Sequence, residues 1–205
     1  MQERPHFPKR AIVTAGMPYG NKGLHFGHVA GVFVPADITA RFLRDRLGGE
    51  NVIFVSGTDC YGSPINEGYR KLVEAGEFDG TISEYVMRNH ERQKDVLDAY
   101  DISLDVFEGS EIGLCGKIHA EVTDKFIRRL YEEGWLEKRS TPQFFDVKAN
   151  TFLNGRQVLG HCPVQGCKSE KAYADECDLG HQYAPVDLIA PVSTLTGTVP
   201  EMRPV

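Results

Sequence analysis

Three short apolar runs rich in β-branched residues limit the fold of this chain most strongly. They cover residues 11–15, 51–56 and 102–107, and each has the length and composition of a buried strand. The segments between them have helical periodicity, so strands alternate with helices along the chain. This alternation predicts parallel βαβ units and hence an open α/β sheet, with a ligand site at the carboxyl ends of the strands.

The segment between the first two runs is predicted to form one helix over residues 28–47. Its apolar residues recur at helical spacing, and Gly48 follows as a stop signal. Pro35 lies inside this stretch. Because proline lacks the N–H that an interior helical residue donates, we expect a kink there.

Three further helices are expected. One covers residues 64–75, and another begins at Thr81, because Thr81 and Glu84 have the spacing of a capping box. The last spans residues 117–133, where apolar side chains repeat every fourth residue, so it should be amphipathic. Beyond residue 135, glycines, prolines and cysteines replace long periodic segments. We therefore expect two units, residues 1–135 and 136–205.

Composition excludes few classes of protein. The chain has 205 residues, enough to bury a substantial core. No run approaches the roughly 18 apolar residues of a membrane helix. Residues 1–10 are polar and lack the apolar core of a secretory signal, so we expect a short flexible lead, no membrane partner and a cytoplasmic location. The net charge of −6 argues against a uniformly basic surface, so any RNA would bind a local patch.

The most informative segment follows the first run, where residues 16–28 read GMPYGNKGLHFGH. A glycine-rich loop that enters a helix exposes backbone N–H groups to an anion. His25 and His28 are three residues apart, so both imidazoles can face one phosphate group, and Gly27 leaves room for a flat ring to approach the backbone. The segment is neither a Walker loop nor a dinucleotide fingerprint. An ordinary turn with two surface histidines is the alternative.

A second polar turn, Gly57-Thr58-Asp59, comes directly after the second run. Strand order at the carboxyl edge should place the Asp59 carboxylate beside the first loop, where it can pair with an ammonium group. Taken alone, such a turn is most often a strand exit capped by aspartate. Whether this turn has a functional role therefore depends on residues 16–28, called the histidine loop from here on.

Three of the five cysteines, Cys162, Cys167 and Cys177, crowd into one stretch together with His161 and His181. In a chain expected to be cytosolic, such clustering favours metal ligation over a disulfide framework. Three thiolates and one imidazole would complete a tetrahedral Zn²⁺ site. His181 is the preferred fourth ligand, because His161 adjoins Cys162 and would strain to reach the same ion. A degenerate knuckle without metal is the alternative.

The two remaining cysteines, Cys60 and Cys115, stand apart from this cluster in the sequence. We expect both to be ordinary, partly buried thiols.

Together these motifs resemble the class I aminoacyl-tRNA synthetases, whose first signature is His-x-Gly-His after the first strand of a nucleotide-binding fold. The longer match in this chain, Pro-Tyr-x-Asn-x-x-x-His-x-Gly-His, is similar to the methionyl-tRNA synthetases. The resemblance covers essentially residues 11–203. It implies an α/β fold: the first half of a Rossmann-like parallel-sheet nucleotide-binding domain, with an inserted zinc-knuckle module.

The same resemblance implies methionine–tRNA ligase activity, in which ATP activates methionine to methionyl-adenylate and the methionyl group passes to tRNA(Met) in translation. The implied catalytic residues are His25 and His28. The implied ATP-binding residues are Tyr19, Asn21, His25, Gly27 and His28; the methionine-binding residues are Met17, Tyr19 and Asp59; and the metal ligands are Cys162, Cys167, Cys177 and His181. Mg²⁺ is expected to accompany ATP, and Zn²⁺ to fill the knuckle.

The chain also departs from the family pattern. Tyr61 stands where the family commonly has histidine, Lys22 where it has glycine, and Gly180 where the knuckle would have its fourth cysteine. The Lys-Met-Ser-Lys-Ser signature is absent from these residues, so we expect a truncated piece that is inactive alone. The alternatives are another class I synthetase, such as the leucyl or cysteinyl type, and a non-catalytic paralogue that binds RNA or protein.

Overall fold

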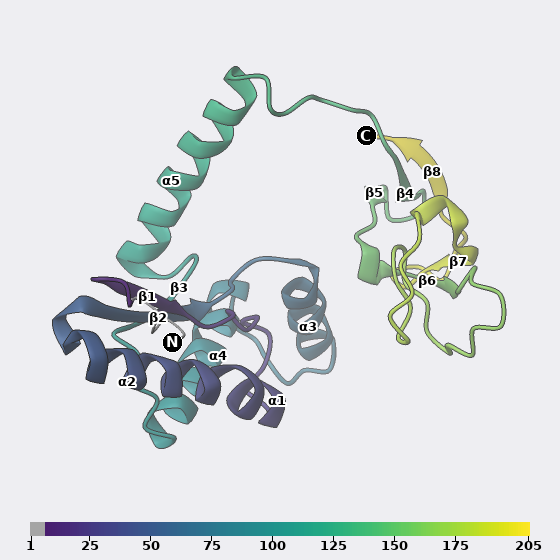
Figure 1. Cartoon of the computed structure of the whole chain (residues 1–205). Coiled ribbons are helices and arrows are strands. Elements are labelled where there is room, and N and C mark those ends of the chain that lie inside the picture. Colours follow the sequence, from purple (N-terminus) through teal and green to yellow (C-terminus); the bar gives the residue numbers. More distant parts are fainter. Residues whose placement is uncertain (1–6) are drawn as a thin grey trace. The chain divides into compact units, whose positions relative to one another are not determined.

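The computed structural model describes residues 7–205. Residues 1–6 of the flexible lead that was expected over residues 1–10 lie outside the described residues. The chain divides into two compact units, the first ending at Arg129 and the second spanning Leu130–Val205. In Figure 1 the first unit runs from purple to teal and the second from green to yellow. Among the described residues, no helix combines the length and the apolar character needed to cross a membrane.

The first unit contains the predicted parallel sheet. Its strands are β1 (Ala11–Thr14), β2 (Val52–Thr58) and β3 (Val106–Gly109), hydrogen-bonded in the order β1-β2-β3. The third strand begins later than the predicted residue 102. There the backbone first turns back on itself, because Ile102 N–H donates to the Leu97 carbonyl at 3.1 Å. Contact with β2 starts only at Asp105, whose N–H donates to the Phe54 carbonyl at 2.8 Å.

The first crossover consists of α1 (Phe26–His28), a π-helical turn η1 (Val29–Phe33) and α2 (Val34–Leu47), which follow one another without a break. The wider π-helical turn lies immediately before Pro35. Because proline cannot donate to the carbonyl four residues earlier, the regular α-helical ladder is interrupted at this point. The disturbance expected at Pro35 therefore takes the form of a π-helical turn.

The second crossover consists of α3 (Ser63–Glu74) and α4 (Ile82–Ala99), while a short 3₁₀ turn, η2 (Gly49–Asn51), precedes β2. The capping box predicted at the start of α4 is confirmed. Glu84 N–H donates to Thr81 Oγ1 at 3.2 Å, and Thr81 N–H donates to Glu84 Oε2 at 2.6 Å.

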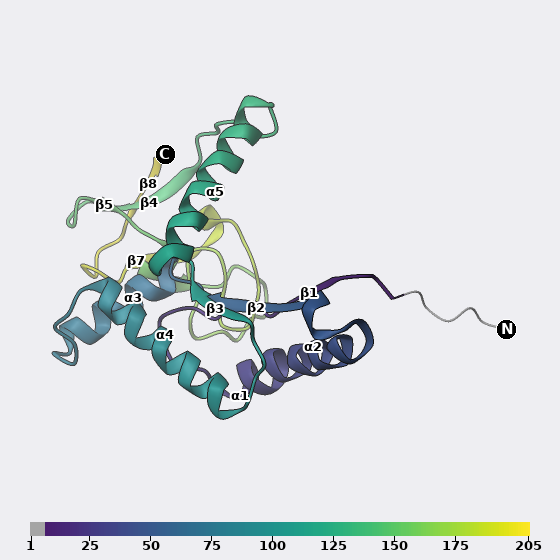
Figure 2. The same cartoon turned by 90° about the vertical axis from the view of Figure 1, so that its left-hand side faces the viewer.

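Both crossovers lie on the same face of the sheet, so α2 and α4 cover that face in two views (Figures 1 and 2). The core of the first unit lies between them and the sheet, and it includes Val13, Phe33, Ala40, Phe54 and Leu97. On the opposite face, Ile12 is 72% exposed and Ile53 is 49% exposed. The runs predicted as buried strands are therefore buried on one face.

The helix α5 (Gly113–Glu132) starts in the first unit and extends three residues beyond Arg129; it begins four residues before the predicted start at residue 117. It ends at Glu132, one residue before the predicted end at residue 133, and Gly134 follows with φ of +79°, a backbone conformation that favours glycine. Its apolar side chains Ile118, Val122 and Phe126 all remain exposed. The periodicity predicted the helix, and its apolar face is solvent-accessible in the described part of the chain.

The second unit consists of short antiparallel strands and turns. Its strands are β4 (Pro142–Asp146), β5 (Thr151–Phe152), β6 (Val158–His161), β7 (Ile189–Ser193) and β8 (Glu201–Pro204), joined as a sheet β5-β4-β8 and a pair β6-β7. Two 3₁₀ turns, η3 (Gly155–Gln157) and η4 (Pro185–Asp187), lie between strands. Its small core includes Phe144, Val158, Leu188 and the thiol of Cys177.

Candidate functional site

The loop after β1 and the turn after β2 are joined by backbone hydrogen bonds. Asp59 N–H donates to the Pro18 carbonyl at 2.8 Å, and Gly20 N–H donates to the Asp59 carbonyl at 2.8 Å. Tyr19 and Asp59 thereby form a parallel bridge beyond the ends of both strands. The side chains of Met17 and Tyr19 are both about half-exposed at this edge. The structure therefore brings the three expected methionine-binding residues to one edge of the sheet.

The Asp59 side chain is half-buried, and Oδ1 accepts a hydrogen bond from the Tyr61 N–H at 3.1 Å. Among the described residues, no side chain pairs with Oδ2. Gly57, two residues earlier, lies against β3 so closely that an added Cβ would meet the Glu108 carbonyl oxygen at 1.9 Å. This close approach explains why glycine stands at this position of β2, two residues before Asp59.

The imidazoles of His25 and His28 are stacked, with ring centroids 3.8 Å apart. His25 Nδ1 accepts a hydrogen bond from the Gly27 N–H at 3.1 Å, and His28 Nδ1 accepts one from the His25 N–H at 3.3 Å. Each ring therefore caps the start of the helical stretch. An Nδ1 that accepts cannot carry the proton, so in the neutral ring Nε2 bears it and is available as a donor. Burial, His25 and Lys22 together lower the pKa of His28.

Gly27 has a second role besides the space that the sequence suggested. A Cβ added at this position would lie 3.0 Å from Cε1 and 3.1 Å from Nδ1 of His25. The His25 ring thus folds over the Gly27 backbone, and glycine is the residue that permits this contact. Asn21 is half-buried, and its Nδ2 lies 3.5 Å from the Pro64 carbonyl at the start of α3. That contact ties the loop to the second crossover.

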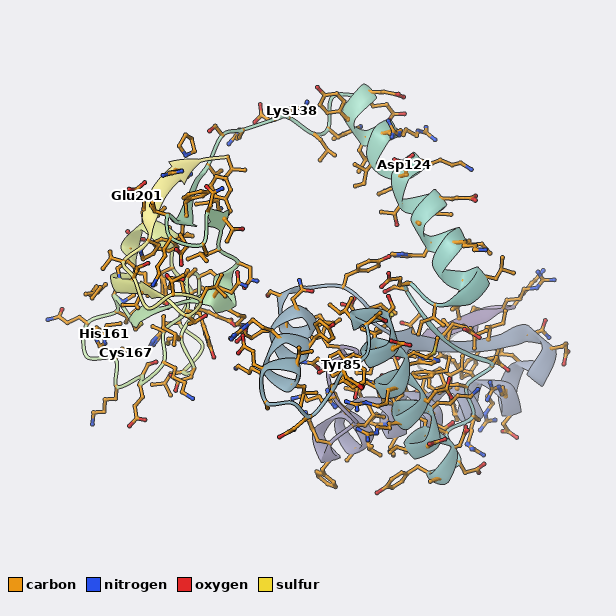
Figure 3. All side chains as sticks on the ribbon, turned by 180° about the vertical axis from the view of Figure 1, so that it is seen from behind. Tyr85, Asp124, Lys138, His161, Cys167 and Glu201 are labelled. Carbon is orange, nitrogen blue, oxygen red and sulfur yellow. The ribbon has the colours of Figure 1, made fainter. Side chains whose placement is uncertain are left out.

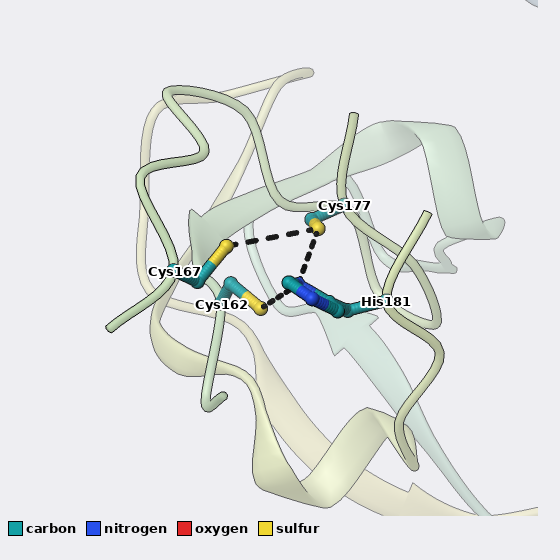
Figure 4. A group of neighbouring side chains, drawn as sticks. All are labelled: Cys162, Cys167, Cys177 and His181. Carbon is teal, nitrogen blue, oxygen red and sulfur yellow. Dashed lines mark hydrogen bonds between the residues drawn. The ribbon is translucent and has the colours of Figure 1, made fainter. Parts of the chain in front are cut away.

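The second unit brings the side chains of Cys162, Cys167, Cys177 and His181 together (Figure 4). Their potential ligand atoms all lie within 4.8 Å of one another. Cys162 Sγ and Cys177 Sγ lie 3.7 Å and 3.5 Å from His181 Nδ1, and the sulfurs of Cys167 and Cys177 are 4.0 Å apart. Four ligands on a tetrahedral ion with bonds of about 2.0–2.3 Å would be spaced by roughly 3.5–3.8 Å. The donor set and its spacing therefore fit a metal ion.

Two glycine turns shape this cluster, Gly166 with φ of +78° and Gly180 with φ of +82°. Gly180 stands where a fourth cysteine was expected, and the left-handed turn at that position lets His181 enter the cluster instead. Burial raises the pKa of the Cys177 thiol, but N–H donors from His181 and Leu179 outweigh burial and lower the pKa to about 6. A thiolate at Cys177 is therefore accessible near neutral pH.

His161 is exposed and lies outside this group of potential ligands (His161 and Cys167 are labelled in Figure 3). Of the two isolated cysteines, Cys60 is buried, at 4% exposure, whereas Cys115 is exposed. The expectation of partial burial is thus wrong for Cys115, which lies in the first turns of α5, the helix whose apolar face is solvent-accessible.

Comparison with known proteins decides the family. The sequence profile described as "tRNA synthetases class I (M)" matches residues 11–205. The chain belongs to this family of class I tRNA synthetases. Its predicted fold, a parallel sheet with helices and a Cys/His cluster, is thereby confirmed.

Curated relatives of this class I synthetase chain carry the name methionine–tRNA ligase. The protein from Cytophaga hutchinsonii is 39% identical over 197 residues, which cover 96% of this chain and 27% of the relative. The protein from Bacteroides fragilis is 38% identical, with 95% and 27% covered. The protein from Chlorobaculum tepidum is 36% identical, with 97% and 26% covered. The chain therefore spans about 27% of the length of the relatives it matches.

A solved structure of Mycobacterium tuberculosis methionyl-tRNA synthetase in complex with methionyl-adenylate has a similar fold. It aligns with a TM-score of 0.57 at 21% identity and covers 96% of this chain and 31% of that chain. This likeness shows that the two chains share a fold.

Two features of the candidate site were not predicted from the sequence. The ring of Tyr61, which departs from the family pattern, stacks with His119 of α5 at a centroid distance of 6.4 Å. Three polar residues of α4, Tyr85, Asn89 and Gln93, are buried and contact the histidine loop. Their spacing of four residues along α4 was the available signal, since it places them on one face of a helix.

Proposed function

We propose that this chain is part of a methionine–tRNA ligase, which activates methionine with ATP and transfers the methionyl group to tRNA(Met). One arrangement supports the proposal. The loop after β1 carries two Nε2–H donors, on His25 and His28, and it is hydrogen-bonded to the turn after β2 that carries the Asp59 carboxylate. A phosphate is bound by N–H donors, and an ammonium group is bound by a carboxylate. The family and the names of the relatives support the same reaction.

In the proposed activation step, a carboxylate oxygen of methionine attacks the α-phosphorus of ATP. The bond from that phosphorus to the bridging oxygen breaks, and its electron pair leaves with pyrophosphate. No side chain acts as a nucleophile, so the protein contributes positioning and charge stabilisation. His25 and His28 would donate to phosphate oxygens as catalytic residues, while Asp59 would pair with the methionine ammonium group.

The remaining site residues would form the two subsites. Met17 and Tyr19 would line the methionine pocket with Asp59, and Tyr19, Asn21 and Gly27 would contact ATP beside the histidines. Mg²⁺ would accompany the triphosphate and neutralise part of its charge. We assign residues 1–135 to the first half of the catalytic domain and residues 136–205 to the inserted module.

Zn²⁺ is the metal that three thiolates and one imidazole suit best. Held by Cys162, Cys167, Cys177 and His181, it would stabilise the turns of the inserted module. Because charging of tRNA takes place where proteins are synthesised, we propose that the protein acts in the cytoplasm.

The test is amino-acid-dependent exchange between ATP and pyrophosphate, measured on the longest natural polypeptide that contains this sequence. Methionine should support exchange, whereas leucine and cysteine should not. Exchange with leucine or cysteine instead would identify another class I synthetase. A protein that exchanges with none of them and binds RNA or a protein partner would be a non-catalytic paralogue. Either of these two results contradicts the proposal.

A further inference from the structure

Four consecutive carbonyl groups of the loop before the histidines point at one face of α4. Tyr85 hydroxyl donates to the Asn21 carbonyl, and Asn89 Nδ2 donates to the Gly20 carbonyl at 3.1 Å. Gln93 Nε2 donates to both the Tyr19 and Lys22 carbonyls, each at 2.9 Å. Every carbonyl from residue 19 to residue 22 is therefore bound by a side chain of α4 (Tyr85 is labelled in Figure 3).

These three donors are buried, so water cannot take the place of the loop carbonyls that they bind. Tyr85 and Asn89 are each 2% exposed, and Gln93 is fully buried. A buried polar group that loses its hydrogen-bond partner destabilises the folded state, because water cannot replace the lost bond. If the loop moved away, Gln93 Nε2 would lose both of its acceptors at once. The loop and α4 therefore hold each other in one arrangement.

The amide of Gln93 is oriented by a second layer of contacts. Thr58 hydroxyl donates to Gln93 Oε1 at 2.8 Å, which turns Nε2 toward the loop. Since the hydroxyl has one proton to give, His90 Nδ1, also at 2.8 Å, must be the donor to Thr58. His90 stacks on Phe107 of β3 and is itself buried. Thr58 directly precedes Asp59, so the network connects the loop to the aspartate turn.

Close packing on both sides leaves little room for an alternative loop position. A Cβ at Gly20 would lie 2.9 Å from Cγ1 of Val86 on α4. A Cβ at Gly68 on α3 would lie 2.7 Å from the Tyr85 hydroxyl oxygen. The two glycines therefore permit the loop and α3 to approach the donors on α4.

We propose that Tyr85, Asn89 and Gln93 are positioning residues that hold residues 19–22 in the ligand-binding conformation before any ligand arrives. This inference rests on the proposed function for its catalytic consequence, because the held loop presents Tyr19 and leads directly into His25 and His28. The buried polar face of α4 thus acts on the site through the backbone of residues 19–22, and its three side chains are not proposed to contact substrate. A preorganised loop avoids ordering cost when ATP and methionine bind.

The test uses amide hydrogen exchange, with the N–H groups of Gly20 and Asp59 as reporters because both are hydrogen-bonded across the site. Gln93→Leu removes two bonds to the loop, and Tyr85→Phe removes one hydroxyl while it keeps the ring. Leu97→Ala is the matched control, since Leu97 is equally buried on α4 but packs in the apolar core. Both loop variants should speed exchange at the two reporters by about tenfold or more relative to amides of α2. Leu97→Ala should not produce that selective change.

The catalytic consequence is measured on the longest natural polypeptide that contains this sequence. Gln93→Leu should lower the kcat of methionine-dependent exchange between ATP and pyrophosphate by about 10- to 100-fold at a temperature where the protein is folded. Leu97→Ala should leave kcat near that of the unaltered protein. If unaltered protein shows no exchange reaction, the proposed function fails, while the amide comparison still decides whether α4 holds the loop.

Two results would overturn the positioning role. One is unchanged exchange at Gly20 and Asp59 in Tyr85→Phe and Gln93→Leu. The other is uniform acceleration over the whole unit in all three variants, which would mean that α4 contributes only to general stability.

Discussion

The backbone N–H of His25 donates to Nδ1 of His28, with 3.3 Å between the two nitrogens. The His25 ring accepts from the Gly27 N–H in turn, so both imidazoles cap the same helical start. This arrangement assigns one proton-bearing nitrogen, Nε2, to each neutral ring. The histidine pair therefore presents two N–H donors as a consequence of how the helix begins.

The first prediction concerns pH. Burial, His25 and Lys22 hold the pKa of His28 in the folded protein below its ordinary value of 6.5. The unfolded chain then binds this proton at a higher pH than the folded chain does. The stability contributed by neutral His28 is fully present above pH 6.5 and is lost as the pH falls through the folded pKa. An NMR titration of the His28 ring should give a pKa below 6.5; a value at or above 6.5 contradicts the proposed cap.

A second prediction concerns the close approach of β2 and β3 beside Asp59. Gly57→Ala should lower the free energy of unfolding by about 1–3 kcal/mol, because its Cβ would overlap the Glu108 carbonyl and force the strands apart. Urea denaturation measures this loss.

Gly31→Ala is the control for Gly57→Ala, because a Cβ at Gly31, which sits in a helical turn, would have no atom within 4 Å apart from its chain neighbours and the backbone of its own turn. It should change the free energy of unfolding by less than about 1 kcal/mol. Equal losses for the two variants would show that the strand contact is not the cause.

A third prediction separates the two candidate histidine ligands. Purified protein should contain close to one zinc ion per chain, measured by elemental analysis. His181→Ala should weaken zinc binding by more than about 10-fold, the smallest loss expected even for a change outside the ligand set. His161→Ala, a substitution at an exposed neighbour of Cys162, should retain the metal. The opposite pattern would assign the fourth ligand to His161.

Local signals in the sequence predicted the order of elements well. The parallel strands, the capping box at Thr81 and the end of α5 near residue 133 each depend on residues that are neighbours in the chain. The start of β3 could not be predicted in the same way. Residues 102–105 are as suited to a strand as residues 106–109, and the hydrogen bond from Ile102 to Leu97 decides between them.

The site shows the same division. The sequence indicated the histidine loop and the aspartate turn, because each follows a recognisable strand. It did not indicate Gln93, because the four-residue spacing from Asn89 shows only that the two share a helix face, not which acceptors Gln93 binds. Those acceptors are backbone carbonyls some 70 residues earlier, at Tyr19 and Lys22.

The most direct test of the account compares His28→Ala with Asp59→Asn in the longest natural polypeptide that contains this sequence. Adenylate formation and methionine binding are measured separately. His28→Ala should slow adenylate formation by about 100-fold and leave the Kd for methionine nearly unchanged, because its proposed partner is phosphate. Asp59→Asn should raise that Kd instead. If His28→Ala weakens methionine binding as much as it slows the reaction, His28 does not act on phosphate.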